Sequence, residues 1–528
     1  MTNLLLKNGR FLTFNERGPQ MDTLLIEEGM IRYAGLEKDF SAALEKNTEV
    51  VDLKGAFVLP GFTDSHIHLL EYGLSLQRVN SETATRQECV QVVKERVEHT
   101  APGDWVLGHG WNHNIWPEGK GTKELLDIFS PQNPIYLTHK SLHSGWANSA
   151  ALKAAGINRD IEDPAGGLIE RDKDGEPTGI VCESAMRLVE TTIPSPSPAQ
   201  RRSALENAQA QLLSMGITSV HDFDVWDCFL TLKEMEQDGA LRLRVIKSIP
   251  FPRLDEAIAE GLRSGGGSDK LRIGWLKLFS DGALGPQTAA MLQSYNGSSS
   301  TGMLFLESEE IFEIGRKAMA AGISMAIHAI GDRANREVIN GFEQLRGQGF
   351  FSPMDLKPRV EHVQIIQPED VRRLAAVGIT ASMQPTHAVS DRDMADRYWG
   401  DRCDNAYAWK SVLDAGAVLI FGSDAPVESP NPFWGLKAAL DRSAPANQPK
   451  RDSWYPQQAL TINQALNAYI PAPQFAAGMG DRAGRLQNGF FADLIVLREN
   501  ILELKPIDLS NLEPIGCMSS GKWIFRDL

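Results

Sequence analysis

The sequence predicts an α/β protein built on a (β/α)8 TIM-like barrel, with a composite β-sandwich from both termini and a long insertion after the first barrel strand. Three observations support this prediction. Apolar, strand-like segments recur through the middle of the chain, and most precede a helix-like stretch. Both ends contain short apolar runs separated by turn residues. About 150 residues separate the first two barrel strands, far more than one helix and its loops need.

The two ends of the chain share one sequence pattern, short apolar runs separated by turn residues. Residues 1–55 contain apolar runs split by Asn-Gly, Glu-Gly and Lys-Gly pairs, which are turn signals. Residues 480–528 resume the same pattern. We therefore expect both segments to form one composite β-sandwich domain, with two unrelated terminal hairpins as the alternative.

Residues 56–479 carry the alternating pattern of the barrel. Continuous apolar runs suit parallel strands that are buried on both faces. Eight strand-then-helix units predict a (β/α)8 barrel. The expected strands cover 57–66, 217–223, 243–251, 273–281, 322–329, 359–365, 378–385 and 417–424.

Residues 70–210 are expected to form an insertion that follows the first strand. A segment at that position would lie over the carboxyl-end mouth of the barrel, where barrel enzymes keep their active sites. Trp116 and Trp146 belong to this insertion. They are candidates to wall a hydrophobic substrate pocket, and packing in the core of the insertion is the alternative for each.

Composition restricts the class of partner. The 528 residues include 53 Lys and Arg against 68 Asp and Glu, a net charge of −15, which argues against nucleic-acid binding through phosphate neutralisation. Five scattered cysteines without a CxxC pair indicate a reduced compartment. No signal peptide or run of about 18 apolar residues is evident. We expect a cytoplasmic protein with a small-molecule substrate and no membrane partner; a homodimer is one option for its assembly.

Ionisable residues interrupt the apolar strands near their carboxyl ends. Buried charges are costly unless they share a partner, and a divalent metal is the obvious one. Imidazole and carboxylate ligands without thiolate suit catalytic Zn, Mn, Fe or Ni better than a structural zinc. His66 and His68 lie two residues apart on a strand, so both point to one face and can bind one ion. The ionisable residues at these strand ends include His66, His68, Lys277, Asp281, His328, His362 and Asp424.

The motifs VLPGFTDSHIHL, WLKLFSDGALG, AIHAIGDRAN, VEHVQ and GSDAPV resemble those of the amidohydrolase superfamily. More closely, the chain resembles the third amidohydrolase family, the metal-dependent hydrolases similar to N-substituted formamide deformylases. The resemblance extends over nearly the whole chain, including HSGWANSAALKAAGI in the insertion and GRLQNGFFADLIVL near the end. It is specific about the family and much less so about the substrate.

The resemblance implies a centre of one or two divalent ions, with zinc the first candidate. His66, His68 and Asp424 would hold the more buried ion. His328 and His362 would hold the second, and Lys277 would bridge both as an N-carboxylated lysine. A carbamylated or neutral lysine can ligate a metal, whereas an ammonium cannot; an ordinary salt-bridged lysine is the alternative.

The implied reaction is hydrolysis of an amide-type, non-peptide C–N bond in a small, partly hydrophobic substrate by a metal-activated hydroxide. Asp424 would take the proton of the attacking water and return it to the leaving nitrogen. His143 in the insertion is a candidate contact to the substrate carbonyl, and His387 after the seventh strand a candidate for the pocket. A structural role is the alternative for both.

Two other functions are considered. One is a mononuclear-metal deaminase of a ring amidine, whose relatives carry a glutamate a few residues after the fifth-strand histidine. This chain reads His328-Ala-Ile-Gly-Asp332 and has Lys277, so both features favour the hydrolase. The other is a non-catalytic barrel scaffold, which loss of ligand residues would signal; all six candidate positions are filled.

Overall fold

The computed structural model describes residues 3–14, 21–41, 47–113, 115–140, 144–351, 356–445 and 451–528. The chain divides into two compact units. One consists of Met1–Gly73 together with Arg202–Leu528, and the other is Leu74–Arg201. Each unit is described by itself below.

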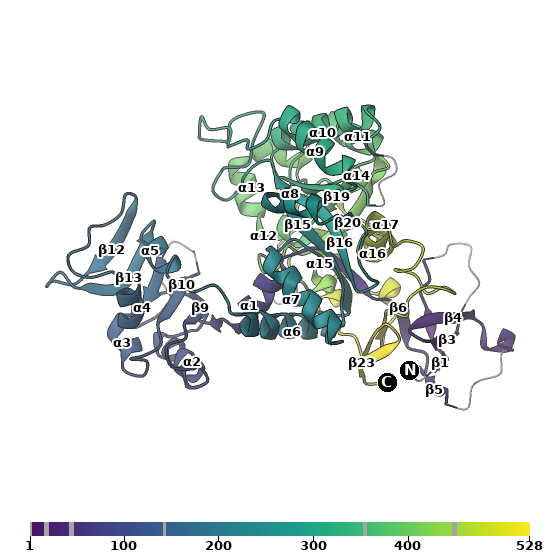
Figure 1. The fold of residues 1–528 in the computed structure, drawn as a ribbon, viewed down its shortest axis with the longest axis horizontal. Coiled ribbons are helices and arrows are strands. Elements are labelled where there is room, and N and C mark those ends of the chain that lie inside the picture. Colours follow the sequence, from purple (N-terminus) through teal and green to yellow (C-terminus); the bar gives the residue numbers. More distant parts are fainter. Residues whose placement is uncertain are drawn as a thin grey trace. The chain divides into compact units, whose positions relative to one another are not determined.

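The first unit contains an eight-stranded parallel sheet that curls into a nearly closed barrel (Figure 1). Each strand pairs with the next one along the barrel in parallel register. The last strand meets the first through a parallel bridge between Ile67 and Ala425. The (β/α)8 prediction is therefore confirmed. The strands are β7 (Phe62–Ile67), β14 (Ile217–Asp222), β15 (Arg244–Pro250), β16 (Leu271–Phe279), β17 (Met325–Ala329), β18 (Arg359–His362), β19 (Thr380–Met383) and β20 (Val418–Phe421).

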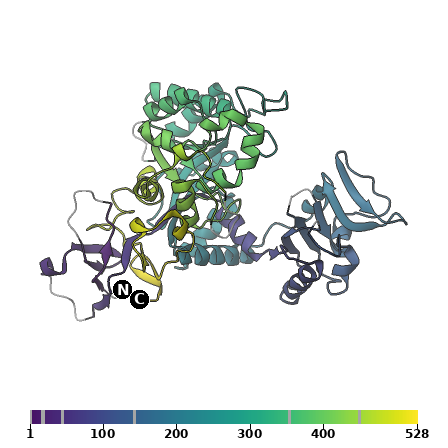
Figure 2. The ribbon, with the colours of Figure 1, turned by 180° about the vertical axis from the view of Figure 1, so that it is seen from behind.

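Helices follow the barrel strands and cover the outside of the sheet, as both views of the ribbon show (Figures 1 and 2). Local signals set their ends: α11 begins at Pro368, which suits a first turn, and is capped by Gly378 at φ 81°. The helices are α1 (Leu69–Gln77), α6 (Pro198–Ser214), α7 (Trp226–Gln237), α8 (Leu254–Ala259), α9 (Ser308–Ala320), α10 (Asp332–Gly347), α11 (Pro368–Val377), α12 (Pro385–Ser390), α13 (Arg392–Tyr398), α14 (Trp409–Asp414), α15 (Pro432–Asp441), α16 (Ile462–Tyr469), α17 (Pro471–Ala476) and α18 (Pro506–Leu509).

The first expected strand, 57–66, is in fact two strands in two different sheets. Phe57–Pro60 forms β6, which pairs with β21 (Leu494–Leu497) from the other end of the chain, and the barrel begins only at Phe62. Gly61 lies at the crossing. A Cβ atom there would come within 2.2 Å of Thr218 Oγ1, so only glycine lets the chain pass this close to β14. The apolar run 57–66 is continuous in the sequence, so its pattern does not show where the chain passes from one sheet to the other.

Both ends of the chain contribute to two further sheets of the first unit. One has the order β4-β3-β1-β5 and the other β2-β6-β21-β22-β23. Their buried faces share one apolar cluster, which includes Leu6, Ile26, Val58, Leu494 and Met518. The strands are β1 (Leu4–Lys7), β2 (Arg10–Phe11), β3 (Thr23–Glu27), β4 (Met30–Gly35), β5 (Glu49–Asp52), β6, β21, β22 (Gly516–Ser519) and β23 (Lys522–Arg526).

The second unit, Leu74–Arg201, lies within the predicted insertion and has a fold of its own. Its sheet has the order β12-β13-β11-β10-β9-β8, and the sheet and the described helices of this unit enclose two apolar clusters. The elements are β8 (Val79–Asn80), α2 (Arg86–Glu98), β9 (Val106–Trp111), α3 (Lys123–Asp127), β10 (Ile135–His139), β11 (Ser144–Ala147), α4 (Ser149–Ala154), β12 (Gly167–Arg171), β13 (Pro177–Glu183) and α5 (Met186–Glu190). Its expected place over the barrel mouth stays a prediction.

Among the residues that the structure describes, no helix is both long and apolar enough to cross a membrane.

Candidate metal centre

The predicted ligand residues come together at the carboxyl ends of the barrel strands. They line one cavity of about 330 Å³ within the first unit. Different strands supply them, so the cluster exists only once the barrel has formed. The lining includes all six predicted ligands: His66, His68, Lys277, His328, His362 and Asp424.

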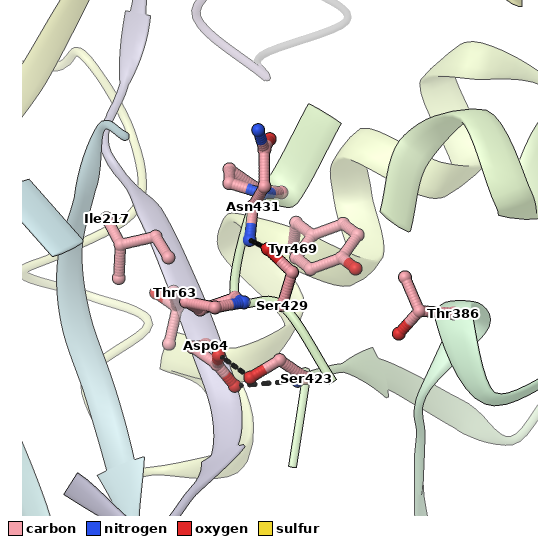
Figure 3. A pocket seen from close by; sticks show the side chains of 11 residues that line it. Thr63, Asp64, Ile217, Thr386, Ser423, Ser429, Asn431 and Tyr469 are labelled. Atoms are coloured by element: carbon pink, nitrogen blue, oxygen red, sulfur yellow. Dashed lines mark hydrogen bonds between the residues drawn. The ribbon is translucent and has the colours of Figure 1, made fainter. Parts of the chain in front are cut away.

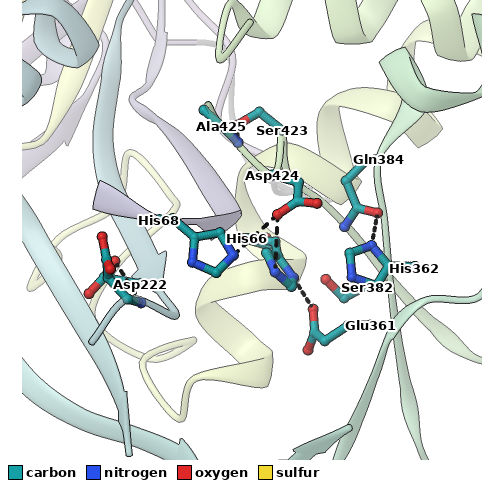
Figure 4. Close-up of polar contacts among 12 residues, drawn as sticks. His66, His68, Asp222, Glu361, His362, Ser382, Gln384, Ser423, Asp424 and Ala425 are labelled. Carbon is teal, nitrogen blue, oxygen red and sulfur yellow. Dashed lines mark hydrogen bonds and ion pairs between the residues drawn. The ribbon is translucent and has the colours of Figure 1, made fainter. Parts of the chain in front are cut away.

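The tightest group consists of His66, His362 and Asp424, whose ligand-type atoms all lie within 4.8 Å of one another (Figure 4). His66 Nε2 lies 3.5 Å and His68 Nε2 3.4 Å from Asp424 Oδ1. His362 also packs edge-on against His328, with 4.5 Å between ring centroids. His66 and Asp424 belong to one of the two ligand groups that the resemblance implies, and His362 belongs to the other, so the two groups lie side by side.

Two of these ligands stand at strained backbone positions. His362 has φ 76° and Asp424 has φ 60°, in the left-handed region that side chains other than glycine rarely adopt. In β18 the strand alternation would turn His362 away from its neighbour Glu361. The change of backbone conformation at the strand end lets both side chains face the barrel interior.

A buried carboxylate fixes the position of the Asp424 loop. Asp64 Oδ1 accepts hydrogen bonds from the backbone N–H of His66 at 3.1 Å and of Ser423 at 3.0 Å, and its Oδ2 accepts one from Ser423 Oγ at 2.5 Å (Figure 3). Burial raises the pKa of Asp64 to about 7. Position 422 next to Ser423 must be glycine, because a Cβ atom there would lie 2.4 Å from the backbone nitrogen of His66.

A second buried network orients His66. Its Nδ1 lies 2.6 Å from Glu361 Oε2, and Glu361 is held in turn by Arg359 at 2.5 and 2.9 Å. Arg359 also donates to the Ser65 carbonyl and to Ser382 Oγ, both at 2.6 Å. With Nδ1 bonded to a carboxylate, Nε2 of His66 is the free ligand atom, as in other carboxylate–histidine–metal arrangements.

Three of these histidines are kept neutral, the form that binds a metal. Burial, helped by the Lys277 ammonium, lowers the pKa of His66 and of His328 to about 4. Burial and the neighbouring His328 hold the pKa of His362 well below its ordinary value. His362 Nδ1 lies 2.9 Å from Gln384 Oε1, which leaves its Nε2 to ligate. His328 Nε2 lies 2.9 Å from the Gly282 carbonyl, which leaves its Nδ1.

Lys277 is buried between aromatic rings. Its Nζ lies 4.6 Å from the centroid of Phe223 and 4.8 Å from that of Phe279. Within the described chain it forms no hydrogen bond or ion pair. Burial lowers the pKa of Lys277 to about 8, although Glu361 and Asp424 oppose this change. A salt-bridged structural lysine would have a carboxylate partner, and Lys277 has none among the described residues.

Asp424 is held as a carboxylate. Burial raises its pKa, but the histidines around it, His66 first, outweigh burial and keep the pKa well below the ordinary value. His387 Nε2 lies 4.0 Å from Asp424 Oδ2 and has no hydrogen-bond partner among the described residues. His387 therefore does line the cavity, with its ring parallel to that of His362.

The remaining predicted site residues are Trp116, Trp146 and His143. Trp116 and Trp146 pack in the apolar core of the second unit, where their indole nitrogens donate to the carbonyls of Thr83 at 3.0 Å and Thr122 at 3.1 Å. Both side chains therefore have the core-packing role that was the alternative to a place in a substrate pocket. His143 falls outside the described residues.

Sequence reasoning missed the residues that orient the ligands. Glu361, Arg359, Gln384 and Asp64 were not singled out. The available signal was their type: a charged or amide residue inside an otherwise apolar barrel strand needs a buried partner. Glu361 adjoins His362 in VEHVQ, and Asp64 precedes the HxH pair, so both lay within the motifs.

The donor set fits a divalent metal. The imidazoles of His66, His68, His328 and His362 and the carboxylate of Asp424 converge on one cavity, and His66 Nε2 is fully buried with no hydrogen-bond partner in the described part of the chain. A buried nitrogen lone pair without a donor is costly unless a cation occupies the space before it. Nitrogen and oxygen ligands without thiolate suit zinc and similar ions.

Comparison with known proteins agrees with this geometry. The model of the amidohydrolase family matches residues 49–525. The chain is 31% identical over 517 residues to Protein LONG AFTER FAR-RED 3 of Arabidopsis thaliana, covering 95% of this chain and 88% of that one. It is 28% identical over 549 residues to N-substituted formamide deformylase of Arthrobacter pascens, covering 99% and 98%.

A solved structure shows the same architecture. An uncharacterized metal-dependent hydrolase of Pyrococcus horikoshii OT3 superimposes with a TM-score of 0.78 at 27% identity, covering 96% of this chain and 99% of the other. The family model, the barrel and the convergent ligands lead to one conclusion: the chain belongs to the amidohydrolase family and is a metal-dependent hydrolase of that family.

Proposed function

We propose that this protein hydrolyses an amide-type, non-peptide C–N bond in a small, partly hydrophobic substrate. The supporting observation is the cavity itself, which joins six ligand-type side chains to an apolar wall of Phe279, Leu284 and Ile330. The relative named N-substituted formamide deformylase makes N-formyl and N-acyl amines the first substrates to consider.

The proposed cofactor is zinc, as one or two ions. His66, His68 and Asp424 would hold one, and His328 and His362 would hold the other. Lys277 would bridge them in its N-carboxylated form; a pKa of about 8 leaves part of it as the neutral amine that reacts with carbon dioxide. When bound, the metal supplies an activated water and a Lewis acid for the carbonyl.

The chain's own groups would orient the substrate and move the proton. Asp424 is ionised and faces the cavity, so its carboxylate can take a proton from water and deliver it to the leaving nitrogen. The Gln364 amide nitrogen lies 3.4 Å from His387 Nδ1, so Nε2 of His387 carries the hydrogen. That N–H can donate to the substrate carbonyl oxygen as negative charge develops there.

The test is a substrate screen on protein of known metal content. N-Formyl amines, N-acyl amines, cyclic amides and carbamates would be incubated with the zinc-loaded and the chelator-treated protein, and amine release measured. We expect zinc-dependent release from at least one amide class. Release from none of them by protein that retains its metal would contradict the proposed reaction.

A further inference from the structure

The residues that line the cavity beside the metal ligands include two chemically different groups. One is apolar and consists of Phe279, Leu284, Ile330 and Val427, of which Phe279 is 52% and Val427 67% exposed. The other is polar and consists of Gln364, Ser390, Asp391 and Glu428. A ligand that fills the cavity must therefore satisfy both.

Gln364, one of the polar lining residues, has a side-chain oxygen that lacks a hydrogen-bond donor among the described residues. The residue is only 4% exposed, and its Oε1 has no partner among the described residues. The orientation of the amide is set by its other end: Nε2 lies 3.5 Å from Asp391 Oδ2, and an exchange of the two amide atoms would place two oxygens together. A ligand that donates an N–H or O–H hydrogen bond to this buried oxygen would therefore be stabilised.

Apart from a bound metal, the charged side chains that line this cavity are mainly acidic. Asp391, Glu428 and Asp424 all line the cavity, and among its described lining residues Lys277 is the only lysine or arginine. Lys277 lies between Phe223 and Phe279. Burial raises the pKa of Glu428, so a cation beside it would be favourable. A substrate carboxylate placed beside Asp391 and Glu428 would meet like charges, with no guanidinium among the described lining residues to bind it.

We infer that the substrate is an N-acyl or N-formyl amine whose nitrogen substituent is apolar near the reacting bond and carries an ammonium or similar donor group, which Glu428, Asp391 and Gln364 bind. This inference rests on the proposed function and names its substrate class. It excludes N-acyl amino acids and other carboxylate-bearing amides as good substrates.

The experiment uses three phenylethyl formamides that differ only in the para substituent: methyl, aminomethyl or carboxyl. For the zinc-loaded parent we expect kcat/KM to fall in the order aminomethyl, methyl, carboxyl. Glu428→Gln should lower the ratio of aminomethyl to methyl by about tenfold or more, since it removes the charge partner. Glu313→Gln is the control, because Glu313 pairs with Arg316 on α9 outside the cavity lining.

Two results would overturn the inference: a preference for the carboxyl compound, or a ratio that Glu428→Gln leaves unchanged. If none of the amide classes of the screen is cleaved, the proposed reaction fails, and calorimetric binding of the three matching free amines decides the inference by itself. Tighter binding of the aminomethyl compound, weakened in Glu428→Gln, supports it. Equal binding, no binding, or preference for the carboxyl compound contradicts it.

Discussion

Among the residues that the structure describes, two buried clusters at the carboxyl ends of the barrel strands have ligand-type atoms close enough to hold a metal. One is His66, His362 and Asp424, and the other is Asp222, Asp224 and Cys228. They differ in how fully their polar atoms are bonded. Among the described residues, the first leaves the buried His66 Nε2 without a hydrogen-bond partner beside a cavity, whereas the polar atoms of the second are bonded by the chain itself.

The saturation of the second cluster is visible in its contacts. Asp222 Oδ2 lies 2.9 Å from Lys247 Nζ, and Asp222 Oδ1 accepts from Leu69 N at 2.8 Å. Asp224 Oδ2 accepts from Glu71 N at 2.8 Å. These bonds tie the start of α1, which follows the HxH motif, to β14. Proximity of ligand types is thus insufficient to define a metal site; unsatisfied buried atoms beside a cavity distinguish it from a structural network.

The largest expected effect comes from removing a ligand of the first cluster. His66→Ala should lose most bound metal and nearly all activity, because His66 Nε2 is buried and has no substitute. Cys228→Ala, the matched change in the second cluster, should keep the metal content of the parent. Metal analysis of both variants after gel filtration would show this. Full metal content in His66→Ala would reverse the assignment of the two clusters.

Breaking the saturated cluster should affect stability instead. Lys247→Met leaves the fully buried Asp222 without its charge partner, which costs about 3–5 kcal/mol of the free energy of unfolding. Denaturant unfolding measures the change, and Lys317→Met is the control because Lys317 forms an exposed pair with Asp255. Equal stability of Lys247→Met and the parent would show that the network carries no stabilising charge pair.

The proton-transfer role of Asp424 predicts an effect on rate. Asp424→Asn should retain the fold and most of the metal but lower turnover by at least ~100-fold, since an amide cannot accept the proton of water. Turnover at matched metal content and the melting temperature are the two readouts. A turnover within a few-fold of the parent would restrict Asp424 to a ligand role.

The smallest effect should come from the residue that orients His66. Glu361→Gln keeps the size and shape of the side chain but weakens its hydrogen bond with His66 Nδ1. The metal affinity should therefore fall by about 10- to 100-fold. Chelator competition measures it. The control is Glu343→Gln, since Glu343 pairs with Arg373 away from the cavity lining. Unchanged metal affinity in Glu361→Gln would assign Glu361 to the fold alone.

Much of this site could be predicted from the sequence because its ligands follow apolar strands. The HxH pair, the histidines of β17 and β18 and the GSD motif each mark a strand end, and parallel strands bring their carboxyl ends to one edge. The orienting residues could not be predicted in the same way. The alternation rule places Glu361 and His362 on opposite faces, and only the left-handed backbone at His362 turns both inward.

The fold was predictable to a similar extent. Continuous apolar strands identify a parallel barrel, but they do not show where one sheet ends and another begins. The strand break at Gly61 depends on the proximity of Thr218, which is distant in sequence. Likewise, the second unit was recognised by its length, whereas its six-stranded sheet depends on pairings that no local pattern specifies.

The central claim, that the metal binds at the unsatisfied histidine cluster, is tested most directly by X-ray absorption at the zinc edge of the zinc-loaded parent protein. We expect only nitrogen and oxygen neighbours at about 2.0–2.2 Å, with the outer-shell scattering of imidazole rings. A sulfur neighbour at about 2.3 Å would place the ion at a cysteine instead and contradict the account.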